Sequence, residues 1–433
     1  MERRLKVAFC HPDLGLGGAE RLIVDAASEL ASKEEVGRVD VWTAYYNKER
    51  SFQETHGSGG FSVRVAGNWF PRSLFGLATA LCSYVRCCLV ALSIVLGRAK
   101  YDVVIVDQVS VVIPIFLLLS SAKVIFYCHF PDQLLASPKT FLHRLYRAPL
   151  NWLEECTTGM AHKLLVNSEY TQGVFASTFR SLARRGLRPQ VLHPAVAIPS
   201  EEDLAEAEAS VCSRLDGDFQ SFLSGGDAFL SINRFERKKG LGLAIRALAE
   251  LRAAEGFPAG SSDGPRLVMA GGYDCRLREN VEHLSELQEE AESLGVGRAV
   301  RFLPSFSDPQ RAALLASCRA VLYTPVNEHF GIVPLEAMAA GRPVVACNSG
   351  GPRETVGGSR GGLLCDPTPA AFASAMSSLL ERYAAAAMGR AARERAAGSF
   401  SRRAFGERLL RVVTEAAATA DGRVLQMSPL PGS

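Results

Sequence analysis

The sequence predicts an α/β protein with two doubly wound, Rossmann-like domains that face a central cleft. Short apolar strands alternate with helical runs, which is the pattern of a parallel sheet covered by helices on both faces. The alternation breaks once, near Pro194–Pro199, and then resumes. The 433 residues suffice for two such domains, whose strands would end at a shared ligand cleft.

The first expected domain, residues 1–197, opens on a buried strand and a glycine-rich turn. An amphipathic helix follows the turn, from Ala19 to about Ser32. The expected strands are short apolar runs: Leu5–Cys10, Val39–Thr43, Phe61–Val65, Val103–Asp107, Val124–Cys128 and Leu164–Asn167.

The second expected domain, residues 228–400, repeats this alternation after a linker, residues 198–227, that carries an acidic helix at Glu201–Leu215. Its expected strands are Phe229–Asn233, Leu267–Ala270, Val300–Leu303, Ala320–Tyr323 and Val344–Cys347. Residues 401–433 are expected to form a C-terminal helix and, from Ala420, a disordered tail.

Composition excludes several classes of protein. Hydrophobic residues make up 48% and charged residues 21%, so a packed core is expected. A net charge of +3 is too small to indicate a nucleic-acid partner. Eleven cysteines without a C-x-x-C pair indicate neither a disulfide framework nor a zinc site, and reduced thiols in the cytosol are the simpler interpretation.

One segment, Ser73–Gly97, is apolar enough to raise the question of a membrane. Its only charged residue is Arg86. A buried helix and an interfacial anchor both fit this pattern, and they remain alternatives. A helix that spans the membrane is less favoured than either.

The first glycine turn, Gly15–Gly18, lies between a strand and a helix. Gly17 and Gly18 would let a ligand approach the backbone, and the helix N-terminus offers free N–H groups to an anion. It is neither a G-x-G-x-x-G nor a P-loop motif, and a simple tight turn is the competing interpretation.

A basic segment, Ser231–Gly240, leaves a strand in the second half. Arg234 and Lys239 would sit at the carboxyl end of that strand and neutralise a diphosphate leaving group without a metal ion. A solvated basic loop is the alternative, and it suits Arg237 and Lys238 better than Arg234.

The sharpest motif, Glu328–Met338, places two glutamates eight positions apart at the start of a helix. The first-turn N–H groups of Gly331, Ile332 and Val333 would bind phosphate. Glu336 would accept hydrogen bonds from vicinal hydroxyls such as those of a ribose. A pair of capping glutamates is the alternative, which the surrounding pattern disfavours.

Two further segments would line the same cleft. Gly350–Thr355 looks like a loop at the end of a strand, and His129 follows the strand Val124–Cys128. The strand-end position of His129 favours a catalytic role over a structural one. Asp216-Gly217-Asp218 matches a metal-binding D-x-D, but it follows a helix rather than a buried strand, so a solvated turn is expected and no metal site.

Together these motifs resemble the retaining glycosyltransferases of the GT-B fold, over about Leu5 to Glu415. Four runs look closer still to the α-1,3/α-1,6-mannosyltransferases of dolichol-linked oligosaccharide assembly: Gly15–Leu22, Tyr127–Asp132, Leu145–Gly159 and Asn327–Glu336. That family transfers mannose from GDP-mannose on the cytosolic face of the endoplasmic reticulum membrane. Some relatives carry hydrophobic segments near the C-terminus, which residues 402–433 lack.

The resemblance implies a role for each motif. The first domain would bind the acceptor and the second would bind GDP-mannose. Gly17 and Gly18 would approach the donor diphosphate, Arg234 and Lys239 would bind it, and His129 would lie near the transferred mannose. Glu328 would contact that mannose, and Glu336 the ribose. No cofactor is implied. The implied partners are GDP-mannose, a dolichyl-diphosphate oligosaccharide, the membrane surface and other mannosyltransferases of the same assembly line.

Three alternatives stay open from the residues themselves. A GT-B transferase could use another nucleotide sugar or a soluble acceptor, and an inactive membrane-peripheral scaffold could keep the fold. The intact Arg234, Lys239, Glu328 and Glu336 argue against the scaffold. A dehydrogenase is disfavoured because no G-x-G-x-x-G follows a strand with an acid about 20 residues on.

Overall fold

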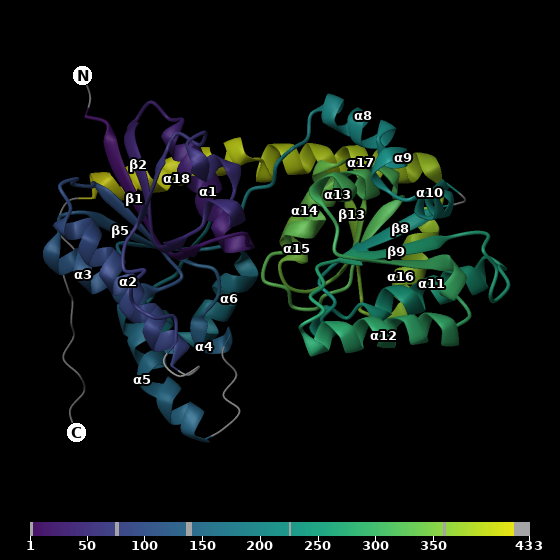
Figure 1. Ribbon diagram of the computed structural model, residues 1–433, viewed down its shortest axis with the longest axis horizontal. Coiled ribbons are helices and arrows are strands. Elements are labelled where there is room, and N and C mark those ends of the chain that lie inside the picture. The colour runs from purple at the N-terminus through teal and green to yellow at the C-terminus, as the bar shows by residue number, and fades with distance from the viewer. Residues whose placement is uncertain (1–2, 74–77, 136–140, 225–226, 358–360, 420–433) are drawn as a thin grey trace. The chain divides into compact units, whose positions relative to one another are not determined.

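The computed structural model describes residues 3–73, 78–135, 141–224, 227–357 and 361–419 (Figure 1). The chain divides into two compact units, residues 1–195 with 402–433 and residues 196–401. The first boundary falls between Ala195 and Val196. Residues 198–227, expected as a linker, join the second unit, and the helix that begins at Arg402 returns to the first. The expected tail from Ala420 lies outside the described residues.

The first unit is a seven-stranded sheet with strand order β3-β2-β1-β4-β5-β6-β7, in which every pairing is parallel. Its strands are β1 (Leu5–Leu14), β2 (Val36–Tyr46), β3 (Ser62–Val65), β4 (Val103–Asp107), β5 (Lys123–Cys128), β6 (Lys163–Val166) and β7 (Gln190–Val191). Its helices are α1 (Gly18–Ala31), α2 (Thr79–Leu96), α3 (Ile113–Leu119), α4 (Asp132–Leu135), α5 (Phe141–Thr158), α6 (Glu169–Thr178), α7 (Arg180–Arg184) and α18 (Arg402–Ala418). Short 3-10 turns are η1 (Lys48–Arg50), η2 (Gln53–His56) and η3 (Ser110–Val112).

The second unit is a six-stranded parallel sheet with the order β10-β9-β8-β11-β12-β13. Its strands are β8 (Ala228–Ile232), β9 (Arg266–Gly271), β10 (Val300–Pro304), β11 (Ala320–Tyr323), β12 (Val344–Cys347) and β13 (Gly362–Cys365). Its helices are α8 (Glu201–Ala209), α9 (Val211–Arg214), α10 (Gly217–Ser224), α11 (Gly242–Ala254), α12 (Arg278–Ser293), α13 (Asp308–Ser317), α14 (Ile332–Ala339), α15 (Pro352–Thr355), α16 (Pro369–Ser378) and α17 (Arg382–Arg395). Short turns are η4 (Arg237–Lys239), η5 (Gly297–Ala299) and the π-helical η6 (Ala396–Phe400).

Each sheet has a hydrophobic core on both of its faces. The central strands β4, β5, β8 and β12 are buried throughout, so their apolar residues need no alternation. In both units the strand order reverses beside the first strand, between β1 and β4 and between β8 and β11. Ligands of open α/β sheets bind outside the carboxyl ends of the strands at such switch points.

Helix α2 shows how the segment Ser73–Gly97 folds where it is described. It packs against β1, β2 and α3, and it buries one face that includes Cys87, Val90 and Ile94. Among the described residues it alone is long and apolar enough to cross a membrane, by length and composition. Its packed face favours the buried-helix alternative.

Candidate functional site

In the second unit, the loop after β8 brings together two of the predicted residues. Lys239 ends the turn η4, where Gly240 takes a left-handed conformation with φ of 61°. The backbone oxygen of Lys239 accepts a hydrogen bond of 2.8 Å from the Thr324 hydroxyl, which ties the loop to the end of β11. The Lys239 ammonium donates to the carboxylate of Glu328. These two side chains are 13% and 22% exposed.

This ion pair keeps Glu328 charged. Burial acts to raise the pKa of the Glu328 carboxyl, but the Lys239 ammonium, together with His329, outweighs burial and the pKa is lowered. Tyr323, at the end of β11, lies beside the pair, and burial together with the Glu328 charge raises the pKa of its hydroxyl well above the usual range. The site therefore presents an ionised carboxylate, an ammonium and a neutral phenol.

The glycine loop after β12 holds Glu328 in place. A Cβ atom on Gly350 would lie 2.4 Å from the backbone carbonyl oxygen of Glu328. A Cβ atom on Gly351 would lie 2.4 Å from backbone atoms of Phe330. The Gly351 backbone N–H donates a hydrogen bond of 2.8 Å to the backbone carbonyl oxygen of Glu328. Only glycines fit here, so the predicted loop at 350–355 positions the glutamate.

Helix α14 begins where the motif predicts. Gly331 precedes it with φ of 83°, a conformation that favours glycine. The first-turn amides, which include Ile332 and Val333, have no acceptor within the helix, and the positive end of the helix dipole lies there. The Ile332 side chain is 39% exposed. The predicted phosphate-binding amides thus lie on the same short segment as Glu328.

Glu336 lies within α14 and has a partner that the sequence did not reveal. Arg311 of α13 donates to its carboxylate at 2.8 Å and also bonds Asp308 at 2.9 Å. Burial raises the pKa of Glu336, and Arg311 only partly offsets it. The side chain remains 23% exposed, which leaves it accessible to a ligand hydroxyl.

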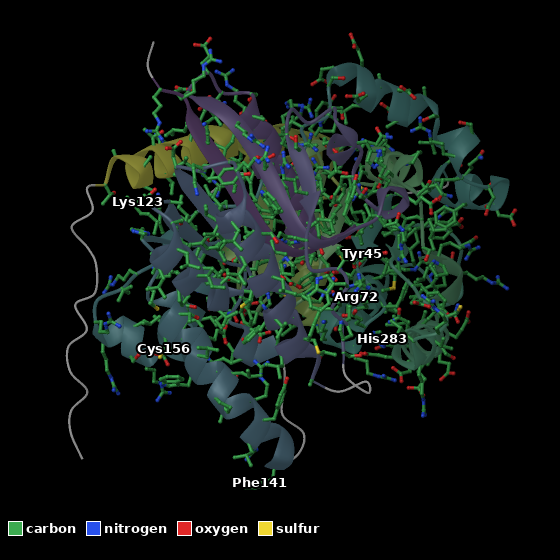
Figure 2. All side chains as sticks on the ribbon, turned by 60° about the vertical axis from the view of Figure 1, so that its left-hand side comes forward. Tyr45, Arg72, Lys123, Phe141, Cys156 and His283 are labelled. Atoms are coloured by element: carbon green, nitrogen blue, oxygen red, sulfur yellow. The ribbon has the colours of Figure 1, made fainter. Side chains whose placement is uncertain are left out.

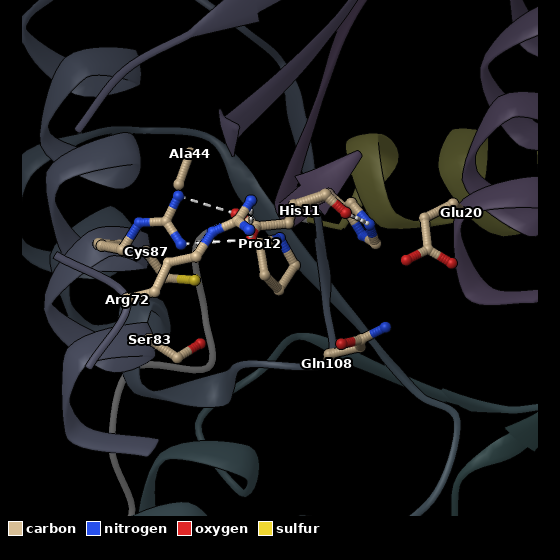
Figure 3. A pocket seen from close by; sticks show the side chains of 10 residues that line it. His11, Pro12, Glu20, Ala44, Arg72, Ser83, Cys87 and Gln108 are labelled. Atoms are coloured by element: carbon tan, nitrogen blue, oxygen red, sulfur yellow. Dashed lines mark hydrogen bonds and ion pairs between the residues drawn. The ribbon is translucent and has the colours of Figure 1, made fainter. Parts of the chain in front are cut away.

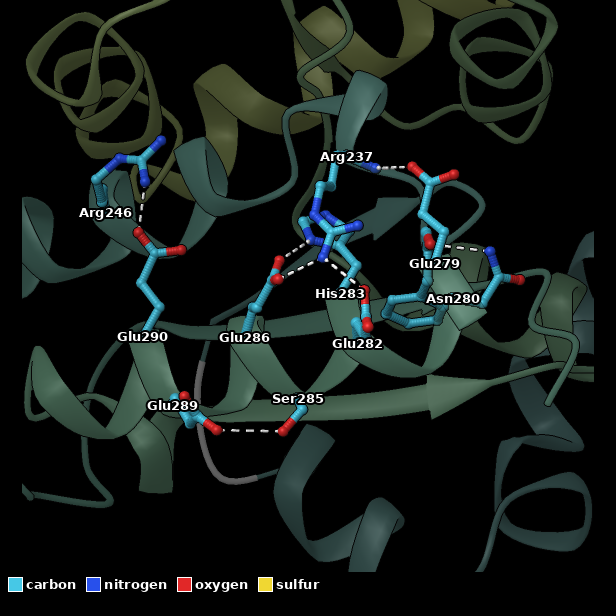
Figure 4. A network of polar contacts seen from close by, with 11 residues as sticks. Arg237, Arg246, Glu279, Asn280, Glu282, His283, Ser285, Glu286, Glu289 and Glu290 are labelled. Carbon is cyan, nitrogen blue, oxygen red and sulfur yellow. Dashed lines mark hydrogen bonds and ion pairs between the residues drawn. The ribbon is translucent and has the colours of Figure 1, made fainter. Parts of the chain in front are cut away.

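Arg234 forms its ion pair with Glu236 and not with the Lys239–Glu328 pair. It is 62% exposed, and its guanidinium lies 2.7 Å from Glu236, which also pairs with Lys238 at 3.0 Å. Arg237 is fastened to α12 through Glu282 and Glu286 (Figure 4). Arg237 thus has a structural role on the surface and is not directed to the Lys239–Glu328 pair. Arg234 is exposed on the same loop as Lys239.

In the first unit, the glycine turn leads into α1 with Gly17 at the N-cap. A Cβ atom on Gly17 would meet the Glu20 carboxylate at 2.2 Å, so that side chain folds back over the turn. A Cβ atom on Gly18 would meet nothing within 4 Å. The backbone at Gly18 is thus open to a ligand, although an acidic group lies nearby.

His129 belongs to a shared imidazole–carboxylate network. Asp107, the fully buried last residue of β4, lies 2.7 Å from Nε2 of His129 and 2.8 Å from Nδ1 of His11. Burial acts to raise the pKa of Asp107, but the two imidazoles bring it down to about 2. Burial acts to lower the pKa of His11, and Asp107 raises it overall.

The network fixes the orientation of His129. Since an ionised carboxylate only accepts hydrogen bonds, the ring must donate from Nε2, which leaves Nδ1 to interact with a ligand hydroxyl. The sequence analysis missed Asp107 and His11. An acid at the end of an otherwise apolar strand was the available signal for Asp107.

The segment Asp216-Gly217-Asp218 forms the start of α10. A carboxylate oxygen of Asp216 accepts a hydrogen bond of 2.8 Å from the Phe219 backbone, as a helix-capping residue does. Within the described ranges, no group of three or more histidines, cysteines, aspartates and glutamates is arranged to hold a metal ion.

Two family models match the chain. The model "Glycosyltransferase Family 4" matches residues 16–196, and "Glycosyl transferases group 1" matches residues 218–395. The alpha-1,3/1,6-mannosyltransferase ALG2 of Mus musculus is 48% identical over 94% of this chain and 96% of its own length. The ALG2 proteins of Homo sapiens and Dictyostelium discoideum are 47% and 40% identical, over 94% and 95% of this chain and 95% and 98% of their own lengths.

Solved structures share the fold at low identity. The Anabaena Alr3699/HepE complex with UDP and glucose has a TM-score of 0.65 at 20% identity, over 95% of this chain and all of that chain. The lipopolysaccharide glycosyltransferase WaaG has a TM-score of 0.63 at 19% identity, over 94% and 99% of the two chains. These likenesses and the two parallel sheets confirm the predicted α/β fold class of two Rossmann-like domains.

Proposed function

Because the chain belongs to the alpha-1,3/1,6-mannosyltransferase ALG2 family, we propose that it transfers mannose from GDP-mannose to a dolichyl-diphosphate-linked oligosaccharide, with retention of configuration. Family membership makes it a hexosyltransferase and confirms the resemblance drawn from its motifs. These relatives do not favour the alternatives of another nucleotide sugar, a soluble acceptor or an inactive scaffold.

The observation that carries the donor chemistry is the pairing of Lys239 with Glu328 at the N-terminus of α14. As the bond from mannose to GDP breaks, negative charge grows on the leaving diphosphate. The Lys239 ammonium and the first-turn amides of α14 would stabilise that charge from fixed positions, and the exposed Arg234 would add to them. Glu336 would bind the ribose hydroxyls.

The carboxylate of Glu328 would stabilise the positive charge that develops on the mannose ring. The mannose ring gains positive, oxocarbenium-like charge as the bond breaks, and an ionised carboxylate beside it lowers the energy of that state. We propose no covalent intermediate. The leaving phosphate would take the proton of the acceptor hydroxyl on the same face, which yields retention.

We assign His129 to the transferred mannose. Its Nε2 is held by Asp107, so Nδ1 would accept a hydrogen bond from a mannose hydroxyl. The open backbone at Gly18 and the N-terminus of α1 would add donors for the diphosphate.

We further propose that the reaction needs no metal ion or cofactor. Protein cations and helix amides at the α14 segment supply the charge that a metal ion would supply in other transferases. Full turnover in excess EDTA is the expected result. Loss of turnover on chelation, with recovery on added manganese, would contradict it.

A lipid-linked acceptor requires a membrane surface, and α5 offers a face for it. Large apolar side chains recur along its exposed side: Phe141 at 78%, Leu145 at 64% and Trp152 at 67% exposure. Figure 2 shows Phe141 at the outer end of this helix. The acids of α5 have partners of their own: Glu154 is buried and accepts from the Asp132 and Gln133 amides, and the half-buried Glu155 accepts from the Ser181 amide.

Charge on this face fits an anionic lipid surface. Arg144 is exposed on α5, while Arg147 is buried against Asp132. An apolar stripe with a tryptophan and a basic flank is typical of interfacial helices. We therefore place the enzyme on the cytosolic face of the endoplasmic reticulum membrane, where other mannosyltransferases of the same assembly would be partners.

A turnover assay tests the proposal. The full chain is given GDP-mannose or UDP-glucose with a polyprenyl-diphosphate-linked oligosaccharide, and the product linkages are determined by NMR. We expect α-linked mannose at the 3- and 6-positions from GDP-mannose alone. Transfer from UDP-glucose at the same rate, a β-linked product, or no transfer would each overturn it.

A further inference from the structure

Helix α2 of the first unit has a cavity beside each of its ends. One, of about 220 Å³, opens beside Ser83 and Cys87 at the carboxyl ends of β1, β2 and β4, where ligands of such sheets bind (Figure 3). The other, of about 310 Å³, opens beside Ile94 and Gly97 at the last turn of the helix. The proposed mannose transfer uses no residue of this second cavity.

The second cavity, which we call the Arg98 pocket, combines arginines with an apolar wall. Its charged lining residues are Arg38 of β2, Arg64 of β3 and Arg98, which directly follows the end of α2. Trp42 and Ala99 belong to its apolar lining. Among the described residues that line this pocket none is acidic, whereas acidic side chains do line the cavity at the other end of α2.

A buried carboxylate, Asp40, lies behind two of these arginines. Nε of Arg38 lies 2.5 Å from it and Nε of Arg64 lies 3.0 Å from it, while the Tyr101 hydroxyl donates to it at 2.6 Å. Burial acts to raise the pKa of Asp40, but these three donors together lower it, so the carboxylate is charged. Both guanidiniums bind Asp40 chiefly through Nε, and their side chains are 39% and 42% exposed, which leaves outer N–H groups for a ligand.

Arg98 has no such carboxylate. In the part of the chain that the structure describes, no ion pair or hydrogen bond holds its exposed side chain. Three guanidiniums therefore share one carboxylate, which leaves an excess of two positive charges at the pocket. The negative end of the α2 dipole offsets only about half of one charge. Lys6 of β1, which is exposed and is the register partner of Arg38, adds a further cation nearby.

The excess charge favours an anion, and the arginines favour a phosphate. Guanidinium groups bind phosphate oxygens through pairs of parallel N–H donors. Trp42 gives the pocket a fixed apolar wall, because its indole N–H donates to Tyr101 at 3.1 Å and Arg64 lies over its ring, 5.5 Å from the centroid. A carbon group attached to the phosphate would pack against this wall.

We propose that the Arg98 pocket binds the phosphate group of a small organic phosphate, apart from the site of mannose transfer. Its volume is at the lower end of the roughly 300–1,000 Å³ of ligand sites, which suits a small molecule. A dissolved phosphate ester and a lipid headgroup carry the same group, and the three arginines would bind it in either. We expect the dissolved ester, because the proposed membrane face lies on α5. The inference does not depend on the proposed function.

Phosphorus NMR of inorganic phosphate tests the pocket on the full chain, with excess GDP present to fill the proposed donor site. We expect saturable broadening of the phosphate signal, with a Kd about tenfold higher in Arg98→Ala, because one hydrogen-bond donor to a charged acceptor is lost. Arg188→Ala removes the same charge from another exposed position of the first unit and should keep the wild-type Kd. Equal weakening in the two variants, or no saturable binding by the wild type, would overturn the proposal.

A second measurement identifies the source of the phosphate. Vesicles of phosphatidylcholine and phosphatidic acid are co-sedimented with the wild type, Arg98→Ala and Arg188→Ala. Equal binding of the two variants supports a dissolved ligand. Loss of vesicle binding in Arg98→Ala alone would support the pocket and assign the phosphate to a lipid headgroup. A chain that binds phosphate through Arg98 but transfers no mannose would keep this inference and overturn the proposed function, and transfer without phosphate binding would do the reverse.

Discussion

The two units carry nearly the same sheet but different chemistry at the ends of their strands. In the second unit, cations meet carboxylates, as in the pairs Lys239–Glu328 and Arg311–Glu336. In the first, one buried aspartate, Asp107, holds two imidazoles. The strand order reverses at the same place in both. The shared fold therefore supplies positions, and the loops supply the chemistry. Under the proposed function the second unit contributes Lys239, Glu328 and Glu336, and the first contributes His129.

Lys239→Ala should produce the largest effect and tests whether charge stabilisation belongs to the second unit. Removing one preorganised donor from the leaving diphosphate should lower kcat about 10²–10³-fold. Steady-state turnover at saturating GDP-mannose measures it. The neighbouring Lys238→Ala removes an exposed ammonium from the same loop and should leave kcat almost unchanged. Equal losses in the two variants would mean that general loop charge matters and the Glu328 pair does not.

The exposed apolar stripe of α5 lies in the first unit, and a triple variant tests its role. Replacing Phe141, Leu145 and Trp152 with serine removes the stripe that would enter the lipid interface. Binding to vesicles of phosphatidylcholine and phosphatidylinositol, followed by co-sedimentation, should fall about 100-fold, with the GDP affinity intact.

The control for α5 removes exposed leucines elsewhere in the same unit. Leu96 ends α2 and Leu118 lies near the end of α3, and each is 80% exposed. Their double serine variant should bind vesicles like the wild type. If the double variant loses vesicle binding while the α5 triple variant still binds, the membrane contact belongs to α2 and α3 instead.

Asp107→Asn tests whether the first unit acts through the orientation of His129. The amide is isosteric but neutral, so His129 loses its anionic partner, and we expect kcat to fall about 10–100-fold. Asp102→Asn changes an aspartate that directly precedes the same strand and should not alter kcat. If kcat of Asp107→Asn depends on pH in the same way as kcat of the wild type, the network has only a structural role.

Part of this arrangement was predictable, because several motifs followed a strand and parallel strands end at one edge of a sheet. Lys239 and His129 were predicted in that way, and Glu328 was predicted from its spacing to Glu336 at the start of a helix. Asp107, Arg311 and Tyr323, which contact His129, Glu336 and Glu328 respectively, were not predicted, since they come from other elements and only the fold brings them close. Strand β7 escaped because its two residues, Gln190 and Val191, show no apolar run.

The pH dependence of stability should differ in sign between two glutamates of the two units. Burial raises the pKa of Glu154, on α5, to about 7. In the unfolded chain it ionises near 4.5, so the folded first unit alone keeps the proton between these values. Its stability should fall, by up to about 3 kcal/mol, as the pH rises from about 4.5 to 7. Glu328 has a lowered pKa and should instead favour folding above its unfolded pKa, an effect that is lost at lower pH.

Urea unfolding of the full chain between pH 5 and pH 8 measures the Glu154 effect. Glu154→Gln keeps an acceptor for the Asp132 amide but has no carboxyl group to titrate. The free energy of unfolding of the first unit should therefore depend less on pH in this variant. A variant with the wild-type slope would show that another group sets it.

The division of labour between the units is tested most directly by the affinity for GDP, measured by calorimetry on two variants. Glu336→Gln changes the proposed ribose contact of the second unit, and Asp107→Asn changes the sugar side in the first. The account predicts that GDP binding weakens about tenfold in Glu336→Gln and stays at the wild-type value in Asp107→Asn. Weakened binding in Asp107→Asn with normal binding in Glu336→Gln would contradict it.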